Sequence, residues 1–98
     1  MYAVVNHLSF AEPVTDEMLD AFREVIPRMR EAGSLGVHIV EVDDRHLVLV
    51  IFSESREVSD RVTETIGSPF MREHVVHLLD GPTQRSVGDV VVSSGGVV

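Results

Sequence analysis

The chain has 98 residues, of which 44% are hydrophobic, and its 16 acidic against 8 basic residues give a net charge of −8. This length fits one domain with a thin core, and the apolar fraction excludes a disordered chain. All basic charge comes from scattered arginines, so we expect no nucleic acid and no acidic membrane surface among the partners.

Cysteine is absent, which excludes disulfides, a thiol nucleophile and a zinc site built on cysteine. No apolar run approaches the roughly 20 residues that a membrane helix needs, and the first residues lack the pattern of a signal peptide. We therefore expect a cytoplasmic protein.

The first predicted strand covers residues 3–10, and the clearest predicted helix follows at residues 15–32. Thr15 is a suitable N-cap, and Gly33 is a suitable residue to end the helix. Pro27 removes a backbone donor and should bend this helix, either around its own core or so as to open space for a ligand. Apolar residues at helical spacing form one stripe, namely Met18, Leu19, Phe22, Val25, Ile26 and Met29.

The next two predicted strands, residues 35–42 and 46–52, form a hairpin around the polar turn at residues 43–45. Six of the seven residues at 46–52 are large and apolar, and they follow one another without a break. Because a strand alternates its faces, this continuous run indicates that both faces of the strand are covered.

Two helical segments and a strand complete the chain. Residues 57–66 are expected to form a helix that ends at Gly67, and Ser68 is expected to cap a second, short helix that residues 81–82 break. The last strand is predicted at residues 87–93, where three consecutive valines favour it.

These elements follow the order β-α-β-β-α-β, the plan of an α+β ferredoxin-like fold with an antiparallel four-stranded sheet. We assign residues 1–94 to this domain and expect residues 95–98 to form a flexible tail. Helices on one face leave the other face bare, with about three large apolar side chains of the strand at 46–52 on it. Burying each contributes roughly 1.5–3 kcal/mol, so we expect a second copy of the chain to cover this face as a homodimer.

Three short motifs carry a resemblance to a known superfamily: GSLG at residues 33–36, FSES at 52–55 and SPFMREH at 68–74. With these motifs the chain resembles the dimeric α/β-barrel superfamily, and within it the small antibiotic-biosynthesis-monooxygenase-like proteins. The resemblance covers nearly the whole chain. It implies that two four-stranded sheets pack face to face into a dimeric α/β barrel, and that each subunit keeps a pocket between its helices and its sheet.

The cofactor-free haem-degrading branch of the superfamily is also similar. Its members use an asparagine on the first strand, a histidine on the last helix and a tryptophan between them, and Asn6 and His74 match the first two. The chain has no tryptophan, and Thr65 stands near the expected place. Haem binding or degradation is therefore the third of the functions that we consider.

The candidate site residues combine this match with the apolar stripe of the first helix. Asn6 is an amide in an apolar strand, and it can bond either a substrate oxygen or a neighbouring backbone group. His74 is a candidate general base, because histidine titrates near neutral pH, or else a partly exposed surface residue. Residues expected to bind the substrate are Phe22, Ile26, Met29 and His77.

Metal and redox cofactors find little support in the sequence. His74 and His77 are three residues apart, whereas the usual helical metal pair is four apart and has an acidic third ligand. Glycines 95 and 96 follow a strand but belong to the expected tail, so they do not indicate a phosphate-binding loop. We therefore expect no cofactor and no metal.

Two functions stay open. The first is a cofactor-independent monooxygenase acting on an aromatic or polyketide-like compound, whose enolate or phenolate supplies the electrons to oxygen. Such a protein needs a dry pocket, a base such as His74 and a polar anchor such as Asn6. The second is a non-enzymatic ligand-binding or assembly module of the same fold, which takes a small apolar or aromatic ligand.

Overall fold

The computed structural model describes residues 1–94, so the tail predicted at 95–98 lies outside the described residues. The elements are β1 (Tyr2–Ser9), α1 (Asp16–Glu31), β2 (Ser34–Asp43), β3 (His46–Ser53), α2 (Arg56–Val62), the π-helix η1 (Thr63–Gly67), α3 (Ser68–His74), the 3-10 helix η2 (Val76–Leu78) and β4 (Gln84–Asp89). This order confirms the predicted ferredoxin-like plan.

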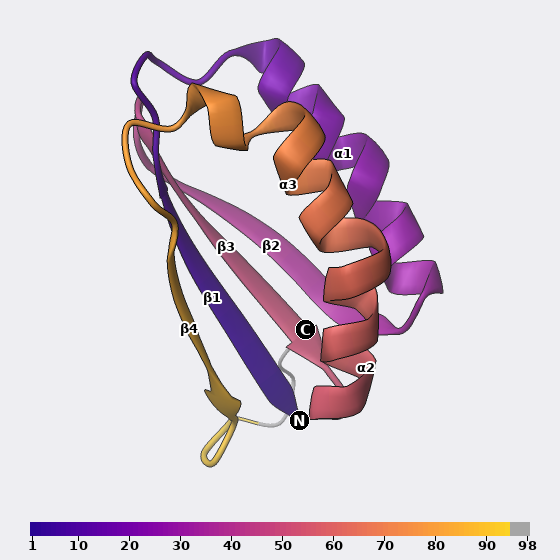
Figure 1. Cartoon of the computed structure of the whole chain (residues 1–98). Coiled ribbons are helices and arrows are strands. Elements are labelled where there is room, and N and C mark those ends of the chain that lie inside the picture. The colour runs from indigo at the N-terminus through magenta and orange to yellow at the C-terminus, as the bar shows by residue number, and fades with distance from the viewer. Residues whose placement is uncertain (95–98) are drawn as a thin grey trace.

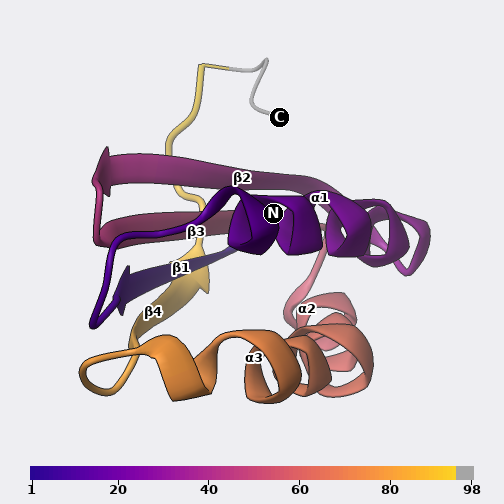
Figure 2. The ribbon, with the colours of Figure 1, turned by 90° about the horizontal axis from the view of Figure 1, so that it is seen from above.

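The four strands form one antiparallel sheet in the order β2-β3-β1-β4. The helices lie together on one face of this sheet (Figure 1), with α1 on the β2 side and α3 on the β4 side (Figure 2). β3 therefore lies inside the sheet, as its continuous apolar run predicts. Within residues 1–94, no helix is both long and apolar enough to span a bilayer.

The first helix has the predicted signals at both ends. The Thr15 side chain accepts a hydrogen bond from the Met18 N–H, which caps the helix. Gly33 follows the helix with φ +127°, a conformation that glycine adopts without a steric penalty. Pro27 lies inside α1, which continues past it to Glu31. The kink expected at Pro27 stays a prediction.

The core lies between the helices and the inner face of the sheet. The stripe of α1 packs against alternate residues of β1 and β3, because alternate strand residues share one face. Buried residues of this core include Leu8, Phe10, Met18, Phe22, Val25, Met29, Leu47, Leu49, Val62, Phe70 and Val75.

The helix break predicted at Gly67 is wrong. Gly67 has φ −63° and ψ −53°, so it stays in the helical region, and the chain passes from η1 directly into α3. The Ser68 N–H donates to the Thr63 carbonyl oxygen across a π turn. Ser68 therefore continues the preceding helical segment and does not cap a new helix. A proline ring clashes with the carbonyl four residues earlier in a regular helix, and the wider π turn accommodates Pro69.

The last helix is shorter than predicted. It ends at His74, because Val75 takes φ −121° while its side chain is fully buried in the core. The chain then tightens into η2, and Leu79 forms a bridge with Phe10. His74 and His77 therefore do not lie on one helix, which corrects the prediction that they share a helical face.

The last strand is displaced from its predicted place by three residues at its start. It pairs with β1 from Gln84 to Asp89, and the last backbone bond of this edge runs from the Val90 N–H to the Met1 carbonyl oxygen. β4 ends at Asp89, so Val91 and Val92 lie outside the sheet and are each 87% exposed. Pairing with β1, rather than the valine run, sets the extent of β4.

Candidate functional site

A cavity of about 210 Å³ lies between the helices and the inner face of the sheet. Most of its lining is apolar, and it comes from both layers of the fold: α1 and the η1–α3 segment on the helix side, and the four strands on the sheet side. The apolar lining residues are Val4, Phe22, Val25, Ile26, Met29, Val37, Leu49, Ile51, Phe70, Met71 and Val76. The volume is somewhat below the roughly 300–1,000 Å³ of drug-sized sites, so it suits a ligand no larger than a bicyclic aromatic.

The walls of the cavity are aromatic on the helix side. The rings of Phe22 on α1 and Phe70 on α3 have centroids 5.1 Å apart and planes inclined by 55°. Met29 lies further along the same stripe, and its flexible thioether adapts to ligands of different shape. Phe22, Ile26 and Met29 line the cavity as their spacing predicts, and their role in binding stays a prediction.

Two polar side chains on neighbouring strands, Asn6 and Arg85, lie side by side in the lining of this cavity. Asn6 on β1 is half-buried, and it lies opposite Leu49 of β3 and Arg85 of β4. Arg85 is exposed and is the only charged residue among the described residues that line the cavity. The wall therefore offers an amide and a guanidinium to a ligand that is otherwise held by apolar contacts.

The π-helix brings a further set of polar atoms to the same wall. Thr63, Gly67 and Ser68 line the cavity, and the π turn runs between the first and the last of them. Single π turns inside helices occur frequently at functional sites. Sequence reasoning missed this turn, although a glycine followed closely by Pro69 within a helical pattern is a signal that could indicate it.

The two candidate imidazoles lie away from the cavity. His74 is on the outer side of α3, with 45% of its side chain exposed, and it stacks on Phe70 with ring centroids 5.0 Å apart. Phe70 thus stands between His74 and the cavity that it lines. His77 is exposed in η2 and lines a different hollow, next to Phe10. Neither histidine is among the residues that line the main cavity, and their roles in catalysis and binding stay predictions.

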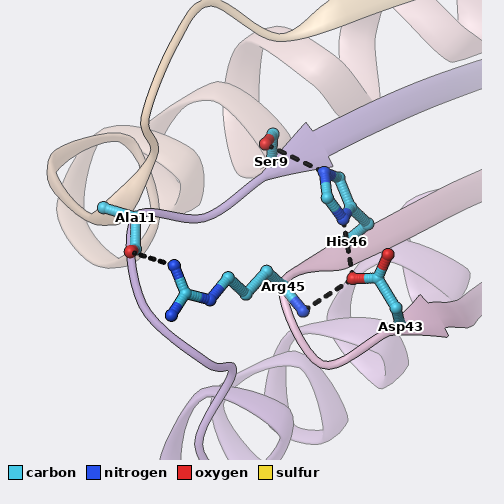
Figure 3. Close-up of polar contacts among 5 residues, drawn as sticks. All are labelled: Ser9, Ala11, Asp43, Arg45 and His46. Atoms are coloured by element: carbon cyan, nitrogen blue, oxygen red, sulfur yellow. Dashed lines mark hydrogen bonds and ion pairs between the residues drawn. The ribbon is translucent and has the colours of Figure 1, made fainter.

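A second polar cluster lies at the β2–β3 hairpin turn, next to the end of β1 (Figure 3). The His46 Nδ1 donates to the Asp43 carboxylate at 2.6 Å, and its Nε2 lies within hydrogen-bond distance of the Ser9 hydroxyl, at 3.1 Å. The Arg45 backbone N–H also donates to Asp43, and its guanidinium donates to the Ala11 carbonyl oxygen. These bonds hold the pKa of Asp43 below its ordinary value, chiefly through the Arg45 N–H and then through His46.

The order of bonds in this cluster is that of a serine–histidine–aspartate triad. Such a hydrolase also needs N–H donors aimed at the developing oxyanion. The backbone N–H groups next to Ser9 already have partners, since Phe10 donates to the Arg45 carbonyl and Ala11 donates to the Leu78 carbonyl. We therefore interpret the cluster as a structural link between the β2–β3 turn and the end of β1.

No group of three or more histidine, aspartate or glutamate side chains within residues 1–94 is arranged to hold a metal ion. No protein-family model matches the sequence, and a comparison with curated proteins finds no match.

Solved structures do match, over nearly the whole chain. A protein from Nitrosomonas europaea, provisionally assigned as an antibiotic biosynthesis monooxygenase, has a TM-score of 0.77 and 20% identity, with 94% of this chain and 100% of that chain covered. SnoaB from Streptomyces nogalater, a cofactor-independent oxygenase, has a TM-score of 0.78 and 11% identity, with 96% of each chain covered. The ActVA-Orf6 monooxygenase of Streptomyces coelicolor, solved with nanaomycin D, has a TM-score of 0.71 and 21% identity, with 94% and 92% covered.

Proteins with other descriptions share the same architecture. One is a Nitrosomonas europaea protein of unknown function, at 10% identity, and another is a dimeric ferredoxin-like protein from an uncultured marine organism, at 16% identity. At these identities the likeness establishes architecture and leaves activity open. The chain therefore has the ferredoxin-like βαββαβ fold of the antibiotic biosynthesis monooxygenases.

Proposed function

We propose that the chain is a small cofactor-independent monooxygenase acting on an aromatic or polyketide-like compound that binds in the helix–sheet cavity. The observation that carries this proposal is the composition of the cavity: apolar walls, two aromatic rings from the helices, and the half-buried Asn6 amide on the sheet side. Two proteins of the same fold, SnoaB and ActVA-Orf6, are described as oxygenases, which supports this reaction class.

The reaction needs a substrate that can reduce oxygen by itself. With 1-naphthol as the example, one oxygen atom of O₂ enters the ring and the other leaves as water, so that naphthol and O₂ give naphthoquinone and H₂O. The electrons come from the ring, which is most reducing when its hydroxyl is ionised. The cavity would exclude water around the ring, and the Asn6 side-chain NH₂ would donate a hydrogen bond to a ring oxygen.

A ligand-binding module is the second candidate, and one observation favours it. No histidine and no carboxylate is among the described residues that line the cavity. A general base on the protein commonly supplies about 10²–10⁴-fold in rate, and this site has none in contact range of the ligand. The module would bind the same flat, apolar ligand without turning it over.

Oxygen consumption separates the two candidates. We expect oxygen uptake by the wild type with at least one of a panel of naphthols and dihydroxynaphthalenes, with one quinone formed per O₂ consumed. Asn6→Ala should lower turnover by about tenfold or more, since it removes a hydrogen bond to a charged oxygen. Thr65→Ala is the matched control, because Thr65 is exposed and does not line the cavity.

Binding of unreactive naphthalene, followed by calorimetry, completes this test. Binding without oxygen uptake on any member of the panel would support the module and contradict the enzyme. Equal turnover in Asn6→Ala and the wild type would remove Asn6 from the site.

We further propose that two copies of the chain pair through the outer face of the sheet, as in a dimeric α/β barrel. This outer face, defined by Val5, Val40, Val48, Val50 and Phe52, alternates with the helix-facing residues and is apolar across three strands. Val40 is 49% exposed, and the other four are only partly buried. A continuous apolar surface of this kind marks an interaction site. Light scattering of the protein at micromolar concentration should give the mass of a dimer.

A further inference from the structure

The register of β4 places one positive charge beside the polar anchor of the cavity. Arg85 lies directly opposite Asn6 in the antiparallel pair of β4 and β1. Residues opposite each other in such a pair have Cβ atoms about 4.5–5.5 Å apart and share one face of the sheet. Both residues line the cavity, so an amide and a guanidinium stand next to each other on its wall.

The guanidinium of Arg85 is without a protein partner in the part of the chain that the structure describes. Ion pairs involve Arg23 and Arg56, and the side chains of Arg45 and Arg61 donate to backbone carbonyl oxygens. Arg28, Arg30 and Arg72 also have no side-chain partner among the described residues, but only Arg85 lines the cavity. The chain has twice as many acidic as basic residues, 16 against 8. An arginine left unpaired among so many carboxylates, at the rim of an apolar cavity, is available to a ligand.

Arginine is suited to an anionic oxygen, because its planar N–H groups donate two parallel hydrogen bonds and keep their charge at any physiological pH. We propose that Arg85 and Asn6 together bind the ionised oxygen of a hydroxy-aromatic ligand, so that the phenolate form is selected over the neutral phenol. This inference rests on the proposed function and adds the residue on β4 that selects the ionised form of the substrate.

This pairing also accounts for a cavity without a base. A free phenol has a pKa of about 10. A positive charge within about 4–6 Å lowers the pKa of an acid by roughly 1–3. The O–H bond of the ligand then breaks with the proton passing to solvent and the electron pair staying on the oxygen. The protein needs no imidazole in contact with the ligand for this step, because Arg85 favours the anion by charge alone.

The test is the ionisation of 1-naphthol bound to the protein, followed through the absorbance of the naphtholate at saturating protein. With the wild type we expect the bound compound to ionise at least about one pH unit below the free compound, a tenfold preference for the anion. Arg85→Gln should abolish this displacement and Arg85→Lys should keep part of it. Arg28→Gln is the control, because it removes the same charge from an exposed position of α1 outside the cavity.

Binding of naphthalene is measured for the same variants as the ionisation of 1-naphthol, and circular dichroism shows that each variant is folded. If naphthalene and naphthol bind but naphthol ionises at the same pH with Arg85→Gln as with the wild type, the inference about Arg85 is overturned while the ligand-binding cavity stands. If neither compound binds at millimolar concentration, the proposed function is overturned, and the inference that rests on it is overturned too. An equal change in Arg28→Gln and Arg85→Gln would show a general charge effect and would also overturn the inference.

Discussion

The two faces of the central strands have similar sequences and different surroundings. On the helix-facing side, Leu47 is 0% exposed and Leu49 is 6% exposed, and both pack under α1. On the outer face, Val48 and Val50 alternate with them along the same strand and remain partly exposed. One chain therefore completes only one of its two apolar layers. We expect the inner layer to determine whether the chain folds and the outer layer to determine whether it pairs.

The largest effect should follow from a charge on the inner face. Leu47→Asp removes a fully buried side chain, which costs about 2–5 kcal/mol for truncation alone, and buries a carboxylate without a partner. This loss is comparable with the roughly 5–15 kcal/mol stability of a whole domain. We expect no native circular dichroism and no cooperative thermal transition. A soluble variant that melts near the wild-type temperature would contradict the assignment of β3 as the central strand.

The same charge on the outer face should separate folding from pairing. Val50 lies between Val5 and His38 on this face, so Val50→Asp places a carboxylate in the proposed dimer interface. We expect native circular dichroism together with a monomer mass in light scattering. Leu78→Asp is the control and should stay dimeric, because it places the same charge on an exposed apolar residue of η2, away from the outer face. A Val50→Asp variant that is still a dimer would show that the two copies pair elsewhere.

The sequence predicts the inner layer well because its signals are local. The stripe of α1 and the cap at Thr15 can be read within a few residues, and so can the apolar run of β3. The extent of β4 cannot be read in this way, because all six of its residues are exposed and pairing with β1 alone selects them. A strand predicted at the valines leaves Arg85 outside the sheet. In the structure the strand begins at Gln84, and the alternation of its faces places Arg85 at the cavity.

The candidate site could be predicted in part for the same reason. Asn6 and the residues of the α1 stripe lie on elements with strong periodicity, so their common side is predictable. His74 depends on where the last helix bends, and neither the π turn nor the turn at Val75 has a periodic signal. Packing of Val75 into the core turns the chain at this point, and packing is not visible in a sequence window.

A substitution of His74 on α3 tests the helix side of the cavity. Its expected effect, on turnover, is smaller than the effects on folding and pairing above. The imidazole lies behind Phe70 and is partly exposed, so His74→Ala should change turnover by less than about threefold, far below the roughly 10²–10⁴-fold that a general base contributes. Oxygen uptake with the best substrate of the panel measures it. A loss in the larger range would mean that His74 reaches the ligand in a conformation other than the one described.

The smallest effect should come from Asp43, whose cluster borders the outer face at the end of the hairpin. Since the folded pKa of Asp43 lies below its ordinary value of about 3.9, ionised Asp43 stabilises the fold above that pH, and the contribution is lost as the pH falls through the folded pKa. Asp43→Asn should therefore lower the melting temperature slightly at pH 7, and its difference from the wild type should shrink below about pH 4. Asp44→Asn removes the same charge from the same turn and measures the effect of net charge alone. A difference that stays constant from pH 7 to pH 3, or that equals the Asp44→Asn difference throughout, would show that the link from Asp43 through His46 to Ser9 contributes nothing specific to stability.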